Sequence, residues 1–292
     1  MSGLVGSSQL FFGDTGFYGH EIEQSCRFDS AGSAYLSRTP SSASNRRTYT
    51  LSCWFKPSGT TLDSPFLAAR TGSGASYSII GFSSSLNKIT IQDNLTTWPT
   101  VQTSAVFRDV SSWYHLVVAI DTTQGTDTNR VKIWVNNELQ TLATTNYYSQ
   151  NADTSINNTI DHHIGQHTGG SYYDGYLAEY HFIDGTALTP SSFGEAKEGV
   201  WTPKAVTGLT YGTNGFYLKF DQTGTGTASA STIGADSSGN THHFTSSGMA
   251  SIDSNRTDSP TNNFATWNKS WAGAGTYGST GTLVNGGLEL SS

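Results

Sequence analysis

Alternation of apolar and polar residues is the strongest pattern in this chain, and it predicts β-strands. From Tyr49 to Lys56, tyrosine, leucine, cysteine and phenylalanine occupy every second position. Successive side chains of a strand point to opposite faces. The first set therefore faces a core, whereas Ser52, Trp54 and Lys56 face the other way.

Two further segments predict long strands. Val131 to Asn136 alternates, with Lys132 and Trp134 on the off-core parity, and Asn136-Asn137 predicts a hairpin corner because asparagine tolerates positive φ. Trp113 to Asp121 is almost continuously apolar, as expected for a strand covered on both faces. Within it, Trp113 and His115 share the off-core parity.

The segment from Ile164 to Leu188 is the most informative. An alternating strand from Tyr176 to Ile183 lies between turns at Asp174-Gly175 and Asp184-Gly185. If Ala178, Tyr180 and Phe182 pack inward, the residues that face the other way are Leu177, Glu179, His181 and Ile183. Shorter strands are predicted at Gln24–Asp29, Tyr77–Phe82, Lys88–Gln92, Thr103–Phe107 and His242–Thr245.

One helix is predicted. Thr189 places a capping hydroxyl before a proline at the first helical position, so the helix covers Ser191 to Lys197 and ends at Gly199. Apolar residues become sparse after Asp221. We therefore expect three parts: an N-terminal arm (1–20), a β-sandwich (21–199) and an irregular, β-rich C-terminal extension (200–292) that packs on the sandwich or on a neighbouring subunit.

Composition narrows the classes of protein. Charged residues make up 13 % of the chain, about half the usual share, and aromatics reach 12 %, which argues against disorder. The net charge is −7 without a cluster of basic residues, so no nucleic-acid partner is expected. No apolar stretch is long enough for a membrane span, and the first residues lack the pattern of a signal peptide.

Several residues could bind metals or form cross-links. Cys26 and Cys53 fall in predicted strands, and we expect them to be buried free thiols. Asp161, His163 and His167 could converge on Zn²⁺, but structural polar residues are the favoured interpretation. The run from Asp236 to Asn240 resembles a Ca²⁺ loop and also a tight turn, and the turn is favoured. No cofactor and no metal site are predicted.

The chain resembles laminin-G-like domains of the concanavalin A-like lectin/glucanase class. The resemblance covers about residues 20–190 and rests on Tyr49–Lys56, Trp113–Asp121, Val131–Asn136 and Asp174–Glu179 in their usual order. It implies an all-β fold, an antiparallel jelly-roll sandwich. The later run FYLKFD…DSSGN also resembles the opening strands of a second such module, which the chain does not complete.

A narrower resemblance covers roughly residues 28–268. DGTALTPSSFGEAKEGVWTPK, YGTNGFYLKFD and DSPTNNFATWN are similar to segments of virion or tail-fibre-like proteins of tailed bacteriophages. This resemblance implies a component of a phage particle, made in the host cytoplasm and exposed as a fibre, appendage or capsid decoration. Its partners would be other virion structural proteins and copies of itself, with a trimer as the leading expectation.

The off-core side chains predict a ligand face. If their strands are neighbours, this candidate face combines Trp54, Lys56, Trp113, His115, Lys132, Trp134, Glu179 and His181. Sugars stack on aromatic rings and form hydrogen bonds at their rims, so the mixture suits a polysaccharide of the host surface. In the alternative, the same side chains pack beneath loops or against another subunit, and the protein is a structural cement or decoration.

No catalytic residues are predicted. Retaining glucanases of this fold place two carboxylates about 5 Å apart on one face of a strand. Here Glu179 and Asp184 stand at opposite parity and would project to opposite faces. A polysaccharide depolymerase needs both on one cleft, so we expect a protein that is not an enzyme.

Overall fold

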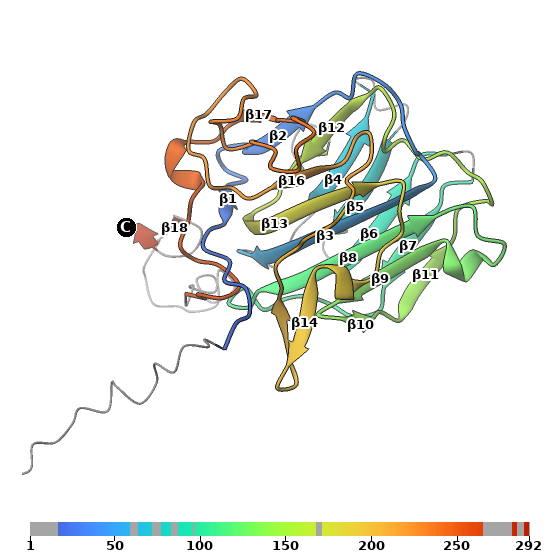
Figure 1. The fold of residues 1–292 in the computed structure, drawn as a ribbon, viewed down its shortest axis with the longest axis horizontal. Helices are drawn as coiled ribbons and strands as arrows, with labels where there is room; N and C mark the ends of the chain where they lie inside the picture. The colour runs from blue at the N-terminus through green and yellow to red at the C-terminus, as the bar shows by residue number, and fades with distance from the viewer. Residues whose placement is uncertain are drawn as a thin grey trace, which may run out of the picture.

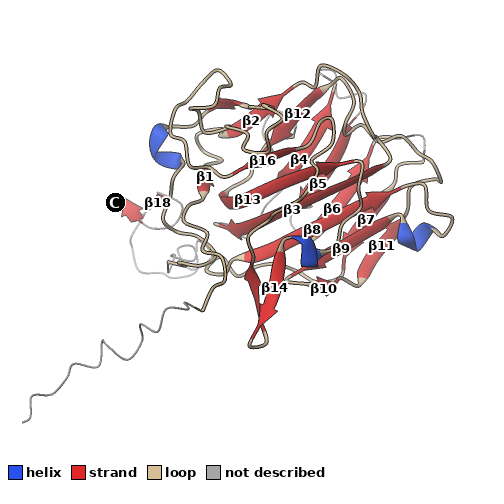
Figure 2. Cartoon of the chain, viewed as in Figure 1, coloured by secondary structure: helices blue, strands red, loops and turns tan. Residues whose placement is uncertain are grey.

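The computed structural model describes residues 17–58, 64–71, 77–82, 87–95, 97–167 and 171–264, and the backbone of β18 (Thr282–Val284) and β19 (Glu289–Ser291). Most of the predicted N-terminal arm lies outside these residues. Strands and loops dominate the described part (Figure 2), and its helical elements are the short 3-10 turns η2 (Asp127–Asn129), η3 (Pro190–Ser192) and η4 (Ser251–Asp253). None of these described turns has the length and hydrophobicity needed to cross a membrane.

Two antiparallel sheets stack face to face (Figure 1). The first sheet has the order β1-β13-β3-β8-β9-β10, and β16 also pairs with β13. Its strands are β1 (Cys26–Phe28), β3 (Thr48–Pro57), β8 (Tyr114–Asp121), β9 (Val131–Val135), β10 (Glu138–Leu139), β13 (Gly175–Asp184) and β16 (Phe216–Leu218).

The second sheet has the order β11-β7-β6-β5-β4-β12-β2-β17. Its strands are β2 (Tyr35–Arg38), β4 (Pro65–Arg70), β5 (Tyr77–Phe82), β6 (Ile89–Asp93), β7 (Thr100–Thr103), β11 (Leu142–Asn146), β12 (Asp161–Ile164) and β17 (Thr245–Ser247). The predicted antiparallel jelly-roll sandwich is confirmed. The strand predictions near 103–107 and 242–245 were displaced by about three residues, and β2, β4, β11 and β12 were not predicted.

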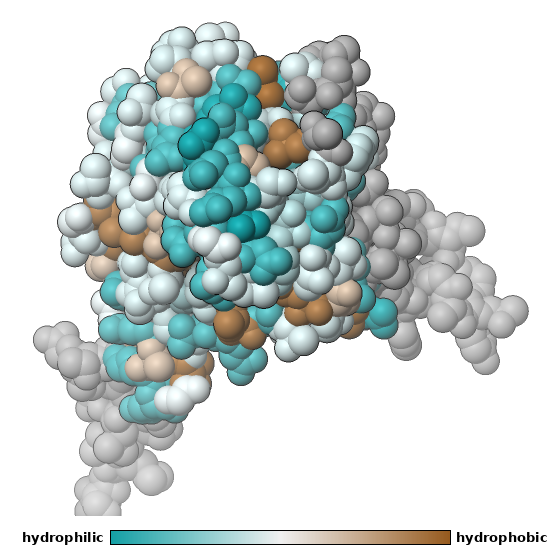
Figure 3. All heavy atoms as spheres, turned by 90° about the vertical axis from the view of Figure 1, so that its right-hand side faces the viewer, coloured by the Kyte–Doolittle hydropathy of each residue, from teal (hydrophilic) through white to brown (hydrophobic). Residues whose placement is uncertain are grey.

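The core lies between the sheets and collects the inward side chains of both. Tyr49, Leu51, Cys53 and Phe55 are all fully buried there, as the alternation predicts. Phe55 meets Phe66 of the second sheet with ring centroids 4.9 Å apart. Full burial of such a side chain contributes about 1.5–3 kcal/mol. In contrast, the face at the right of Figure 1 is mostly hydrophilic, with apolar side chains in small groups (Figure 3).

Both cysteines are buried and free, as predicted. Cys26 lies in β1 and Cys53 in β3, and both belong to the core. Burial raises the pKa of both thiols. They are therefore inert apolar residues of the interior rather than reactive groups.

A β-bulge in β13 corrects part of the predicted parity. Ala178 pairs with Trp54 but His181 pairs with Ser52, so β13 holds one extra residue between these two pairs. Glu179 occupies the bulge with φ +45°. As a result Leu177 enters the core and Ala178 joins Trp54 on the opposite face, so the prediction was wrong for Leu177 and Ala178. Beyond the bulge, residues 180–183 follow the predicted parity.

The predicted helix over Ser191 to Lys197 was wrong. After the single turn η3, the chain forms the hairpin β14 (Gly194–Lys197) and β15 (Val200–Pro203). Glu198 (φ +52°) and Gly199 (φ +82°) form its two-residue turn. Two successive positive φ values are the signature of a type I′ turn, whose twist matches paired strands. Asn136 and Asn137 form a similar corner between β9 and β10, as predicted.

The run FYLKFD does not open a second module. Its residues Phe216–Leu218 form β16 and extend the first sheet beside β13, while Thr245–Ser247 extend the second sheet beside β2. Apolar side chains of this segment enter the same core: Phe216, Leu218, Phe220, Ile233 and Phe244. The interpretation as a second module was wrong because these side chains fill the first sandwich.

Candidate functional site

A groove of about 580 Å³ lies beside the hairpin β14–β15, on the face of the first sheet that is turned away from the core. We call this face, with the segments that cover it, the outer layer. Several elements distant in sequence form the groove. Its lining residues are Tyr18, Trp54, Ser112, Trp113, Asn136, Glu138, Gly199, Val200, Trp201, Pro203, Pro260 and Asn263.

A stack of three rings holds two of the tryptophans that line the groove, Trp54 and Trp201. The His115 ring lies between Trp54, at 4.8 Å between centroids, and Trp201, at 6.0 Å. The indole Nε1 of Trp201 donates a hydrogen bond to His115 Nδ1 (3.0 Å). Because an indole N–H can only donate, Nδ1 accepts, and Nε2 then carries the proton and donates to Ser52 Oγ (2.9 Å).

Burial keeps His115 neutral. It is 1 % exposed, and desolvation, with a smaller contribution from the nearby His181, lowers its pKa to about 3. Both ring nitrogens are already occupied by Trp201 and Ser52. His115 therefore holds two tryptophan rings in place and does not act as an acid or a base.

Trp113 and Lys56 meet at a buried carboxylate next to the groove. The Nε1 of Trp113 donates to Asp258 Oδ1 (3.0 Å), and Lys56 Nζ donates to Asp258 Oδ2 (2.9 Å). Lys56 is fully buried and Trp113 is 8 % exposed. The C-terminal segment that carries Asp258 therefore covers this end of β3.

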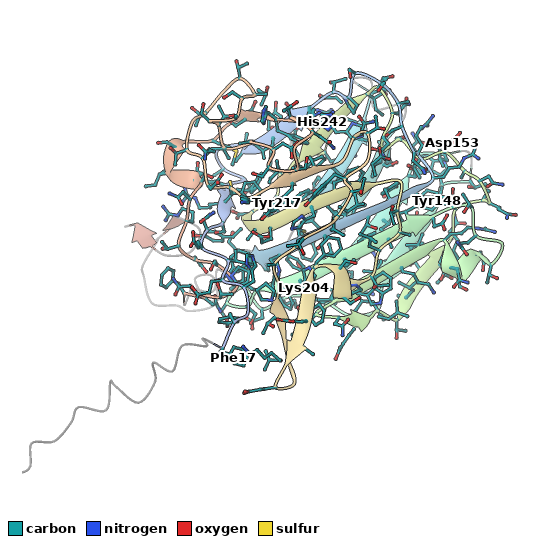
Figure 4. The ribbon with its side chains drawn as sticks, viewed as in Figure 1. Phe17, Tyr148, Asp153, Lys204, Tyr217 and His242 are labelled. Carbon is teal, nitrogen blue, oxygen red and sulfur yellow. The ribbon has the colours of Figure 1, made fainter. Side chains whose placement is uncertain are left out.

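Glu179 and His181 lie deeper in the outer layer. Glu179 accepts hydrogen bonds from the Tyr217 hydroxyl at 2.7 and 2.8 Å, and its Oε2 lies 3.4 Å from His181 Nε2. Burial alone would raise the pKa of Glu179, but its contacts with His181 and Tyr217 outweigh this effect, so its pKa is lowered. Tyr217 of β16 and Lys204, next to β15, come from the covering segments (Figure 4).

The structure brings all eight predicted residues onto one face, because their strands are neighbours in the first sheet. Most of that face is covered by other segments, and the groove occupies only part of it. Lys56, His115 and His181 are at most 1 % exposed, Glu179 lies against Tyr217, and Lys132 and Trp134 are half-buried. Trp54 and Trp113 alone among the eight line the groove.

The sequence interpretation missed the other groove residues. Trp201 and Val200 were expected to follow a helix, whereas they belong to a hairpin strand. The Glu198-Gly199 pair was a usable turn signal for that hairpin. No local signal marks Tyr18, Pro260 or Asn263, since long-range packing alone brings them to the groove.

The other candidate clusters are structural. His163 contacts Asp161 (2.6 Å) and Gln166 (2.5 Å). No group of three metal-binding side chains occurs among the described residues. The Asp236 carboxylate is occupied by donors at the backbone nitrogens of Tyr217, Ser238 and His242. These donors define a tight turn.

The two carboxylates of β13 lie on opposite sides of the strand. Asp184 pairs with the core residue Tyr49 and accepts hydrogen bonds from Asn157 and Asn214, whereas Glu179 lies in the outer layer. A pair of carboxylates across one cleft is therefore not formed by these residues.

Comparison with known proteins identifies the family to which the chain belongs. Residues 29–192, more than half of the chain, match the family model Laminin_G_3, described as the concanavalin A-like lectin/glucanases superfamily. The chain belongs to this superfamily. No curated protein matches the sequence.

Solved structures with similar folds have low sequence identity. A candidate carbohydrate-binding protein from Bacteroides ovatus is 14 % identical (TM-score 0.48), with 78 % of this chain and 58 % of that chain covered. Domain 4 of the extracellular arabinanase AbnA from Geobacillus stearothermophilus, solved with arabinotriose, is 16 % identical (TM-score 0.45; 59 % and 76 % covered). The LG1-3 region of the laminin alpha2 chain is 12 % identical (TM-score 0.42), and this chain covers 31 % of its length.

Proposed function

We propose that this protein is a glycan-binding module whose ligand lies in the groove beside the hairpin. The observation that carries the proposal is the combination of aromatic rings and polar groups around one groove. Trp54, Trp113 and Trp201 supply flat apolar surfaces, and Asn136 and Glu138 supply amide and carboxylate groups. Sugars stack their C–H faces on such rings and form hydrogen bonds through their hydroxyls.

The chemistry of the groove favours binding over hydrolysis. Among the described residues that line the groove, Glu138 is the one acidic side chain. Hydrolysis of a glycosidic bond requires a second carboxylate to act as nucleophile or base. A polysaccharide can therefore be held along the groove without being cut.

A glycan array probed with the purified full-length chain tests this proposal. Trp201→Ala removes one wall of the groove, and Trp98→Ala is the matched control, because Trp98 is 50 % exposed and does not line the groove. We expect the Trp201 variant to lose at least about tenfold in affinity, which corresponds to about 1.4 kcal/mol. The control should bind like the unmodified protein.

Two results would contradict the proposal. One is equal binding by the Trp201 variant and the unmodified protein. The other is no binding to any glycan by a chain whose folded state is verified by circular dichroism. A Glu138→Gln variant adds a milder test, because it removes one charge from an exposed residue without opening a cavity.

We further propose that this module works on a bacteriophage particle, as a homo-oligomer exposed on a fibre, appendage or capsid. The support is the resemblance of DGTALTPSSFGEAKEGVWTPK and YGTNGFYLKFD to phage virion proteins. Sedimentation analysis should then give a trimer, and mass spectrometry of purified particles should find the chain among virion proteins. A monomer at micromolar concentration would contradict the oligomer.

A structural cement or decoration protein is the second candidate. It is favoured by the burial of Lys56, His115 and His181, since a covered face holds few ligands. If this second function is correct, the protein binds no glycan on the array but still assembles with copies of itself.

A further inference from the structure

Lys56, the residue before the last one of β3, is a buried lysine with three hydrogen-bond acceptors around its amine. Its side chain is fully buried, and Nζ donates hydrogen bonds to Asp258 Oδ2 (2.9 Å), Asn263 Oδ1 (2.8 Å) and the Phe264 carbonyl oxygen (2.6 Å). Trp113 contacts the same Asp258, and Tyr176 pairs with Lys56 across the strands. A buried primary amine and a buried carboxylate therefore meet the exposed carboxamide of Asn263 within hydrogen-bond distance.

The contacts of Asn263 orient its side-chain amide. Nδ2 donates to the Ser111 carbonyl oxygen (2.9 Å), and Oδ1 accepts from Lys56 Nζ. The Ser111 oxygen can only accept, and a lysine ammonium can only donate, so these partners allow one orientation of the amide. The carbonyl carbon Cγ, one bond from Oδ1, is consequently held next to the lysine nitrogen.

We propose that Lys56 and Asn263 become joined by an intramolecular isopeptide bond, with Asp258 transferring the proton. Asp258 accepts a proton from the Lys56 ammonium, and the neutral amine attacks Cγ of Asn263. The new bond is Nζ–Cγ, and the bond that breaks is Cγ–Nδ2. As the amide forms, the attacking nitrogen loses a second proton to the same carboxylate. Asp258 passes both protons to the departing nitrogen, which leaves as an ammonium ion, so the chain loses one molecule of ammonia and Asp258 ends as the carboxylate it began as. The step needs no oxidant, reductant or further reactant.

The surroundings favour this reaction. Burial disfavours the charged form of Lys56 and lowers its pKa, although the hydrogen bond and charge of Asp258 partly oppose this. The Asp258 side chain is 3 % exposed and is fixed by Trp113 Nε1. Holding the reactants in contact replaces an encounter between two groups by an intramolecular step. The bond would tie the C-terminal segment to β3 next to the groove, independently of any glycan.

Mass spectrometry of the intact, denatured full-length chain tests the proposal. After allowance for processing of the first methionine, we expect a mass lower than that of the sequence by one molecule of ammonia. A protease digest should contain a branched peptide that joins Lys56 to Asn263. Asn263→Ala should restore the full mass, and Asn262→Ala is the matched control, because Asn262 is a neighbouring exposed asparagine without contact to Lys56.

Three results would overturn the proposal. The first is the full sequence mass in the unmodified chain. The second is a loss of ammonia without a branched peptide, which would indicate a succinimide at an asparagine. The third is a loss of water with a branch at Asp258, which would assign the bond to another partner. Because Asn263 is exposed, its variant leaves the core intact. The mass measurement needs no glycan, so it tests the bond separately from the proposed function.

Discussion

The interior of the sandwich and the outer layer are both closely packed, but different kinds of residue pack them. The interior joins the two sheets through aliphatic and aromatic side chains, with Phe55 touching Phe66, Phe82 and Tyr114. The outer layer mixes tryptophan and tyrosine with buried lysine and histidine and a half-buried glutamate. There, nearly every polar atom has a partner, as in the chain Trp201–His115–Ser52.

This difference shows what covers each face. An antiparallel sheet often leaves one face to water and therefore carries polar residues on it. Here those polar residues remain, but segments 190–211 and 254–264 lie over them. The outer layer is therefore held by directional hydrogen bonds and by buried ion pairs such as Lys56–Asp258, whereas the interior depends on apolar area and shape.

The largest expected effect is a cavity in the interior. Phe55→Ala should lower the free energy of unfolding by about 3–5 kcal/mol, because a fully buried aromatic side chain is lost without replacement. Chemical denaturation measures this loss of unfolding free energy. Ile252→Ala, at a residue 62 % exposed, should change stability by no more than about 0.5 kcal/mol. Similar losses in both variants would contradict the assigned core.

The next effect concerns a buried carboxyl group of the interior that is only partly hydrogen-bonded. Asp93 is fully buried, its Oδ1 has no hydrogen-bond partner, and Oδ2 accepts from Ser78. Burial raises its pKa to about 7. The folded state thus binds the proton more tightly than the unfolded state, so stability falls as the pH rises from about 4 to about 7, by at most about 4 kcal/mol.

Asp93→Asn should remove this loss, because the amide keeps an acceptor for Ser78 and carries no charge. Urea unfolding from pH 4.5 to 8 should show that the variant is more stable than the unmodified protein at pH 8 and that the difference shrinks toward pH 4.5. Asp127→Asn, which makes the same substitution at an exposed carboxylate, is the control and should change stability by no more than about 0.5 kcal/mol. A constant difference between Asp93→Asn and the unmodified protein would contradict the burial of a charge.

The outer layer should respond to pH in the opposite direction. The pKa of His115 is lowered to about 3, so the unfolded state binds a proton below about 6.5 that the folded state does not. Stability then falls as the pH drops, by about 2 kcal/mol between pH 6.5 and 5 from this residue. His115→Gln should reduce the slope of unfolding free energy against pH in that range. An unchanged slope would mean that His115 titrates freely.

The smallest effect concerns the hairpin that covers the outer layer. Gly199→Ala should cost about 1 kcal/mol, because alanine disfavours φ +82° even though an added Cβ would meet no atom within 4 Å. Gly125→Ala is the matched control: its Cβ also enters open space, and its φ lies outside the positive range. Because the added Cβ meets no neighbour in either variant, the difference between their thermal unfolding temperatures reports the backbone strain at Gly199.

The parts of the structure that depend on local alternation could be predicted from the residues alone. The faces of β3, β8 and β9, the free buried cysteines and the Asn136-Asn137 corner were predictable, since strand geometry forces every second side chain to one side. The same pattern placed eight candidate residues on one face. It also predicted the class of fold, an antiparallel sandwich.

What lies over that face depends on contacts between segments that are far apart in the chain. The bulge at Glu179 shifted Leu177 and Ala178, because one inserted residue reverses the parity of a strand. The hairpin around Gly199 and the segment that carries Asp258 and Asn263 reach the outer layer from far along the chain. Such contacts depend on the summed packing of the whole molecule, which no local pattern of residues contains.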